Sequence, residues 1–342
     1  PGCVLLLATA QSLAGAPAFD GRLYVASEQP NAFAAWLRRG GVQGRLDPVS
    51  VDAILKIDAD SFRADQMLAR IGAAQVRGHV QVSGIGSAPR VETGITADRL
   101  DLDQIRVLAG LFASPAGLAP AATRIDLDAG QLVLGGVTAR GVSARLAVDG
   151  ESVEVSRLSV QDAAGAALDM TGRIDRFAAR PDGNLQATVK AATLDGLVRM
   201  LRSLFPDTPA LDRFAAAAPH LAPLDARLTL TGQANGERGD LQLDVSGTAG
   251  PSRLAVAGKL AGSPAEWRAG RIDLNARLDG PDGGRLMRQL GISALSLKGA
   301  AGQASVTLAG VPATGLDGTA ELEALGSRLA LSGRVIAGDD GR

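Results

Sequence analysis

The sequence predicts a mainly β protein in which an antiparallel sheet is built from loose repeats and accompanied by a few short amphipathic helices. Many segments alternate apolar and polar residues with a period of two, as in Arg227–Thr231, which is typical of strands with one face in water. The 342 residues include 43 glycines, a share well above the usual roughly 7%. Glycine recurs with Asn or Asp at turn positions between the alternating segments, which favours antiparallel pairing.

One short pattern recurs four times along the chain, with apolar residues alternating around a glycine. The marker glycines are Gly78, Gly172, Gly258 and Gly333. Recurrence of this kind indicates a repeat architecture, and the unequal intervals indicate that loops differ between units. We therefore predict a single elongated repeat array over 1–342, a piece of a longer chain. Its units would be roughly 1–78, 79–172, 173–258 and 259–342.

Amphipathic helices are predicted where the alternation gives way to helical spacing. The clearest follows Leu194, Leu197, Val198 and Leu201, spaced i, i+3, i+4 and i+7. Similar corners begin near Phe33, Leu102 and Leu286.

So few short helices could not cover the apolar face of a wide sheet, and an exposed face of that size would aggregate. Three solutions follow from the residues alone. The sheet closes into a packed sandwich or solenoid, folds part-way into a groove, or holds an apolar guest that is not protein.

The candidate inward residues are mostly Leu, Val, Ile and Ala, and aromatic residues make up only 3% of the chain. Dense two-sheet cores generally use more aromatics to fill a gap of about 10 Å. An aliphatic lining leaves room, and acyl chains are its natural guests, although a plain packed core stays an open alternative. The side chains predicted to line such a trough are Leu228, Leu230, Leu241, Leu243, Val245, Ile272, Leu274, Leu329 and Leu331.

Charge and composition exclude several other functions. The 35 Lys and Arg against 36 Asp and Glu give a net charge of −1, which removes the electrostatic case for nucleic acid. One cysteine and two histidines leave little for thiolate zinc sites or a catalytic triad. Paired acids such as Asp58 and Asp60 lack the surrounding loop of a calcium site and are predicted to be solvated. We predict no metal, no cofactor and no enzymatic activity.

The start of the chain allows two interpretations. Residues Val4–Ala10 resemble the apolar region of a signal peptide, but no basic segment precedes them. The alternative is a strand around Ala8–Leu13.

Three segments resemble the AsmA-like family of Gram-negative envelope proteins. They are Gly15–Leu23, Gly72–Gly78 and Thr96–Asp103, and the diffuse resemblance extends from about Gly15 to Val335. It implies an elongated, curled antiparallel sheet with a hydrophobic groove, related to bridge-like lipid-transfer proteins. It carries over no catalytic residues.

The same resemblance implies a function. Family members are typically held in the inner membrane by an N-terminal helix, extend into the periplasm, and are linked to outer-membrane assembly and phospholipid movement. We therefore expect a non-enzymatic periplasmic protein that shields phospholipid acyl chains and is attached to the inner membrane through a segment not in this chain. Outer-membrane or other envelope proteins would be further partners. The alternative is a structural or adhesive β-solenoid with a closed dry core.

Overall fold

The computed structural model confirms the prediction of a mainly β protein with a few short helices. The chain divides into two units, residues 1–150 with 157–160 and residues 151–156 with 161–342. Strand β9 (Ser152–Ala163) has residues in both units. The structure describes residues 2–11, 18–32, 46–105, 121–177, 179–204, 211, 215, 218–235, 238–290, 292 and 300–335.

In the first unit, eight strands pair in chain order. All neighbouring pairs are antiparallel except β6 with β7, which is parallel. A parallel pair needs a long connection, and twenty residues, 102–121, separate the two strands in the sequence. Strand β1 lies where the sequence allowed a strand or a signal-like segment. The strands are β1 (Gly2–Gln11), β2 (Ala18–Ser27), β3 (Val49–Ile57), β4 (Ser61–Ile71), β5 (Ala74–Ser83), β6 (Arg90–Asp101), β7 (Ala122–Leu134) and β8 (Val137–Asp149).

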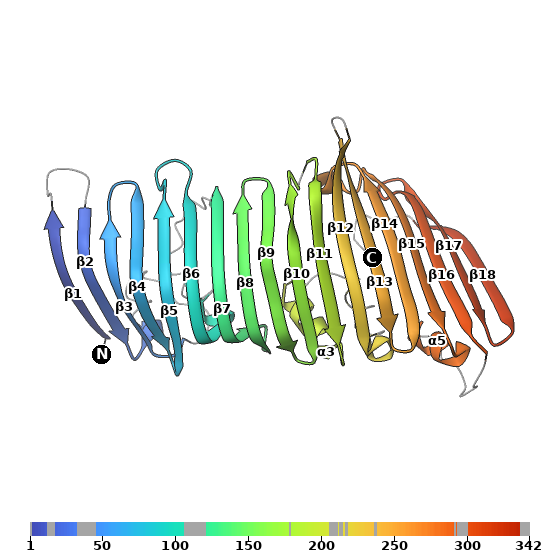
Figure 1. Cartoon of the computed structure of the whole chain (residues 1–342), viewed down its shortest axis with the longest axis horizontal. Coiled ribbons are helices and arrows are strands. Elements are labelled where there is room, and N and C mark those ends of the chain that lie inside the picture. The colour runs from blue at the N-terminus through green and yellow to red at the C-terminus, as the bar shows by residue number, and fades with distance from the viewer. Residues whose placement is uncertain are drawn as a thin grey trace. The chain divides into compact units, whose positions relative to one another are not determined.

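In the second unit, each strand from β10 to β18 pairs antiparallel with the next (Figure 1). The helices α3 and α5 and a 3₁₀ turn lie in the connections, and residues 218–221 are also helical. The elements are β10 (Ala166–Asp175), β11 (Asp182–Ala191), α3 (Asp195–Leu204), β12 (Leu224–Asn235), β13 (Arg238–Ala249), β14 (Ser252–Ala261), η1 (Pro264–Glu266), β15 (Arg271–Gly280), α5 (Gly283–Gln289), β16 (Gly302–Val311), β17 (Gly315–Ala324) and β18 (Ser327–Val335).

The four repeated sequence segments are strands that follow tight two-residue turns. They form β5, β10, β14 and β18. The turn Leu325–Gly326 before β18 has φ values of 56° and 76°, and Ala164–Gly165 before β10 has 51° and 95°. Two successive positive φ values are typical of type I′ turns, whose twist matches that of paired strands. The repeat in the sequence is therefore a repeat of hairpins.

The marker glycines serve different local purposes. Gly172 has φ +133°, and an added Cβ would press on the carbonyl oxygen of Asn184 and lie 2.7 Å from the Cα of Leu185. A Cβ at Gly258 would lie 3.4 Å or more from every heavy atom, in ordinary contact with Leu243 and the side chain of Leu274. Backbone geometry thus requires glycine at 172 but not at 258.

We expect Gly172→Ala to lower the free energy of unfolding by more than about 1 kcal/mol, because alanine is strained at this φ and the β10–β11 backbones must separate. Gly258→Ala should change it by less than about 0.5 kcal/mol or stabilise the strand slightly. Urea unfolding of both variants measures the difference. Equal effects would contradict this distinction.

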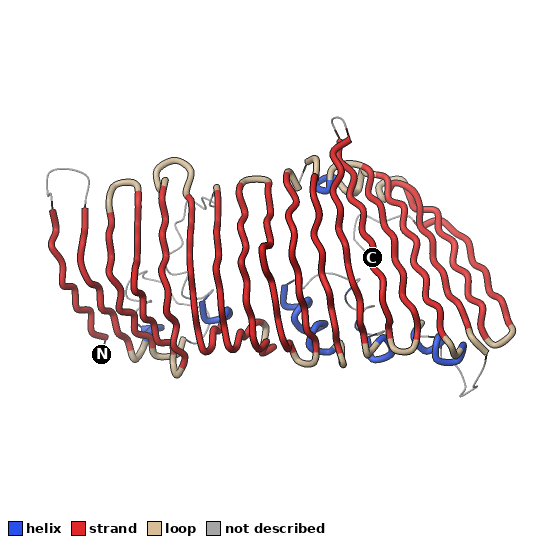
Figure 2. The backbone as a smooth tube through the Cα atoms, in the orientation of Figure 1, coloured by secondary structure: helices blue, strands red, loops and turns tan. Residues whose placement is uncertain are grey.

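Helices α3 and α5 lie at the same end of the strands of the second unit (Figures 1 and 2). Both connections leave the sheet at that end, α3 after β11 and α5 after β15. The helices bury Leu194, Val198 and Leu286 against the sheet. The predicted helix near Leu102 appears as a short helical segment over 102–105, whereas most of the helix predicted near Phe33 falls outside the described residues.

A buried hydrogen-bond network fixes α5 to the sheet. The hydroxyl of Ser252 donates to Oε1 of Gln289 at 2.6 Å. Nε2 of Gln289 donates to the carbonyl oxygens of Ala249 at 2.8 Å and His220 at 3.1 Å. Ser252 is fully buried and Gln289 nearly so. One amide group therefore joins α5, the ends of two strands and the segment 218–221.

Replacing Gln289 by leucine should lower the free energy of unfolding by about 1–3 kcal/mol, because the buried Ser252 hydroxyl and two carbonyl groups lose their partner. Urea unfolding measures the change. As a control, Gln242→Leu removes an exposed amide that bonds only at the surface, and it should have an effect below about 0.5 kcal/mol. Equal losses in both variants would show that the buried network does not anchor the helix.

Candidate functional site

In the second unit, the pairing register between neighbouring strands places apolar residues on one face of the sheet. Directly paired residues in antiparallel strands project to the same face. Following the pairs from β10 to β18 therefore traces a row across nine strands, and this central row contains no polar side chain. It consists of Gly172, Leu185, Leu230, Leu243, Gly258, Leu274, Leu308, Gly318 and Gly333.

Two flanking rows on the same face are also apolar. The first contains Met170, Ala187, Leu228, Val245, Val256, Ala276, Val306, Ala320 and Leu331, and the second contains Ile174, Gly183, Gly232, Leu241, Leu260, Ile272, Gly310 and Leu316. Together with the central row they are called the open rows below.

All nine side chains predicted to line a trough belong to this apolar face. Eight lie in the open rows, whereas Leu329 pairs with Leu322 one row nearer the helices. Sequence inspection missed other members of the same rows, including Leu185, Leu260 and Leu308. Their alternation was visible in the sequence, but placing them needs the register between neighbouring strands.

Burial differs sharply between the open rows and the rows under the helices. The clusters around α3 and α5 include the sheet residues Ala166, Ala191, Ala249, Leu278 and Ala304, all from rows at the helix end. Leu278 is 8% exposed there. In the open rows Val306 is 38% and Leu331 is 60% exposed, and most other members are half-buried. Ile174, Ala187 and Gly232, on β10 to β12, are the buried exceptions. Among the described residues, no helix takes part in a buried cluster over the open rows.

The first unit has an apolar face built in the same way. One row there passes through Gly78, Ile95, Leu127 and Ala144 on β5 to β8. A buried cluster on β3 and β4 contains Ala53, Leu55 and Ala64, with Phe19, Leu23, Phe62 and Met67 packed against it. The amphipathic pattern of the sheet is therefore common to both units.

The opposite face of the second unit carries charged side chains in short-range pairs. Arg277 Nε donates to both carboxylate oxygens of Asp279 at 2.9 and 3.0 Å, and its Nη2 donates to Gln303. Arg173 bonds Asp175 at 2.9 Å, which lowers the pKa of that carboxyl with help from Ser152. Each pair spans two residues along one strand, where side chains share a face. These exposed ion pairs keep this face hydrated and contribute little to the free energy of unfolding.

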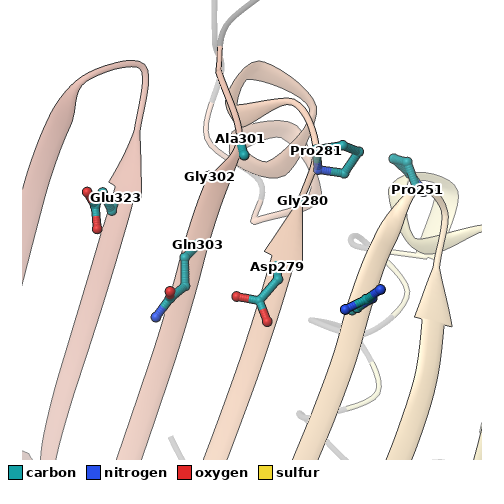
Figure 3. A pocket seen from close by; sticks show the side chains of 9 residues that line it. Pro251, Asp279, Gly280, Pro281, Ala301, Gly302, Gln303 and Glu323 are labelled. Carbon is teal, nitrogen blue, oxygen red and sulfur yellow. The ribbon is translucent and has the colours of Figure 1, made fainter.

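A depression of about 530 Å³ lies on the charged face near α5. Asp279, Gln303 and Glu323 line it from the adjacent strands β15, β16 and β17, and Pro251 and Pro281 stand at its border (Figure 3). Arg277 bonds Asp279 and Gln303, so these two polar side chains of the depression are engaged on the sheet itself.

The described part of the chain offers neither a metal site nor a membrane-spanning helix. No group of three or more His, Cys, Asp or Glu side chains is placed to hold a metal ion. None of the helices there has the length and apolar character needed to cross a membrane. The feature that distinguishes this protein is thus an amphipathic sheet whose apolar face is partly uncovered.

Comparisons with known proteins do not assign this chain to a family. Neither the known family models nor the curated proteins match this chain. Among solved structures, the crystal structure of Pseudomonas aeruginosa OccK10 (OpdN) aligns over 98% of this chain and 95% of its own, at 10% identity and a TM-score of 0.17. A likeness at that score carries no argument about this protein.

Asp98 on β6 shows how carboxylates support the sheet. Its Oδ1 accepts hydrogen bonds from the backbone N–H groups of Gln75 and Arg99, each at 2.7 Å. These bonds, the one from Gln75 foremost, lower the pKa of Asp98 below its ordinary value of 3.8. The folded state therefore binds this proton less readily than the unfolded state does.

Asp98→Asn should reduce the free energy of unfolding at neutral pH, because the amide oxygen is a weaker acceptor than a carboxylate. The difference from wild type should be complete above about pH 5, where the unfolded carboxyl is also ionised. It should shrink as the pH falls through the lowered folded pKa. Urea unfolding between pH 2.5 and 7 tests this, with the exposed Asp20→Asn as control; a difference independent of pH would contradict it.

Proposed function

We propose that the apolar face of the second unit shields lipid acyl chains, and that the protein acts without catalysis in phospholipid movement between the two membranes of a Gram-negative envelope. The observation that carries this proposal is the set of three open rows, two of which are apolar across nine strands and the third across eight. An apolar surface of this extent is unfavourable in water unless something covers it.

Dimensions are compatible with acyl chains as guests. Nine strands at a spacing of about 4.8 Å make the central row roughly 38 Å long. An acyl chain spans half of a hydrocarbon core about 30 Å thick, so one chain along the row would cross about three or four strands. The second unit could hold more than one chain side by side or end to end.

The strength of such binding would come from methylene burial alone. Each methylene group taken fully from water contributes about 0.8 kcal/mol, so a sixteen-carbon chain covered on one side would gain on the order of 6 kcal/mol. The leucines, valines and alanines of the open rows offer no hydrogen bonds, so they would not select a headgroup. Passive shielding of this kind suits transport along a gradient rather than tight storage.

The resemblance to the AsmA-like family supports a location of this activity in the cell envelope. A periplasmic position, attachment to the inner membrane through a segment outside this chain, and partners among outer-membrane or other envelope proteins all belong to this proposal. The closed, dry β-solenoid is the competing structure, and the leucines of the open rows, which are only partly buried, do not favour it.

The test is native mass spectrometry of the gently purified chain, followed by lipid extraction. Wild type should carry phospholipid at a reproducible stoichiometry. The double variant Leu230→Asp, Leu243→Asp should lose it, because two paired carboxylates in the central row would have to be desolvated against acyl chains.

The matched control places two aspartates on the charged face of the same strands. Thr231 pairs with Gln242, and Ser246 pairs with Arg227, so Thr231→Asp, Ser246→Asp should retain lipid. A wild-type chain that is well folded and free of lipid would overturn the proposal in favour of a dry core. Unfolding of the Leu230 and Leu243 variant, with no lipid in wild type, would do the same.

A further inference from the structure

The strand ends of the second unit opposite α3 and α5 expose two aromatic side chains. Phe177, in the connection between β10 and β11, is 39% exposed, and Trp267, in the connection between β14 and β15, is 47% exposed. Only 3% of the chain is aromatic. We use the name rim for the described residues of the two connections, 176–177, 179–181 and 262–270.

Contacts between neighbouring connections hold the rim in place. Pro181 is fully buried, and Gly239 on β13 approaches it so closely that a Cβ there would collide with the proline ring. The N–H of Gly262 donates to the carbonyl oxygen of Gly239 at 3.1 Å, and the N–H of Ala313 donates to that of Arg268 at 2.9 Å. The aromatic side chains are therefore displayed by an ordered backbone rather than by free loop tips.

Cationic groups accompany both aromatics. The guanidinium carbon of Arg268 lies 5.5 Å from the ring centroid of Trp267, a cation–π arrangement. Arg176 precedes Phe177 and lies 3.9 Å from Asp182. An indole with an apolar body and a polar edge, beside a guanidinium that bonds phosphate, matches the boundary between lipid headgroups and acyl chains.

Position on the sheet points to the same partner. In the flanking row nearest the rim, Leu241, Leu260, Ile272 and Leu316 are only partly buried, whereas Ile174 on β10 is fully buried. No described helix takes part in a buried cluster over this row. The other end of the strands carries α3 and α5 (Figure 2). A lipid leaving a bilayer that touches the rim would meet the apolar face directly, whereas at the other end the helices intervene.

From these observations we infer that the rim is a membrane-contact surface, with Phe177 and Trp267 inserting at the headgroup level of a phospholipid bilayer and Arg176 and Arg268 meeting its phosphates. The contact would lie along one side of the sheet, at the strand ends. The support from the position of the rim rests on the proposed function, whereas the exposed aromatics and the arginines beside them support the contact independently.

Flotation with vesicles of mixed phosphatidylethanolamine and phosphatidylglycerol tests the inference. Wild type should bind, and Phe177→Ser, Trp267→Ser should bind about tenfold more weakly. Tyr24→Ser is the matched control, since Tyr24 is an aromatic residue that is 40% exposed on β2 of the first unit and is not part of the rim, and it should bind as wild type does. Absence of wild-type binding, or equal binding by the rim variant, would overturn the inference.

Fluorescence provides a second measurement that needs no change in the rim. In a Trp36→Phe background, Trp267 emission should shift to the blue on addition of vesicles and be quenched by brominated acyl chains. Unchanged emission would overturn the inference. The rim variant should keep any co-purifying lipid, so loss of vesicle binding with retained lipid separates the rim from the proposed acyl-chain site.

Discussion

Strand register is the constraint on which the rest of this structure depends. Side chains alternate with a period of two, so a slip of one residue would move a whole strand's leucines to the charged face. In the second unit the pairs continue without a shift from β10 to β18. Tight turns such as Leu325–Gly326 allow one register only, and the alternation of Leu with Arg, Asp or Thr penalises every other.

Once the register is set, the helices decide which part of the apolar face is buried. The amide of Gln289 joins α5 to Ser252 and Ala249, and α3 places Leu194 and Val198 over the start of β10 and the end of β11. These contacts build two small cores at one end of the strands. The open rows lie beyond them, so the same sheet supplies a packed core at one end and an accessible apolar surface over the rest.

The charged face and the rim complement this arrangement. Pairs such as Arg277 with Asp279 keep one side of the sheet in water without demanding a partner. Phe177 and Trp267 concentrate aromatic surface at the strand ends that carry neither α-helix. Water, acyl chains and a bilayer surface would therefore each meet a different part of the second unit, and a carrier that takes up lipid from a membrane needs all three.

The sequence by itself determined the fold class, the four repeated hairpins and the polarity of nine side chains, because alternation and turn residues are local properties. It also predicted the helices near Leu194 and Leu286 from spacing alone. The parallel pairing of β6 with β7, the different needs of Gly172 and Gly258, and the Gln289 network were decided only by the tertiary structure. So was the division of the apolar face into covered and open rows. Each depends on which residues lie opposite one another across strands, and local periodicity carries no information about that.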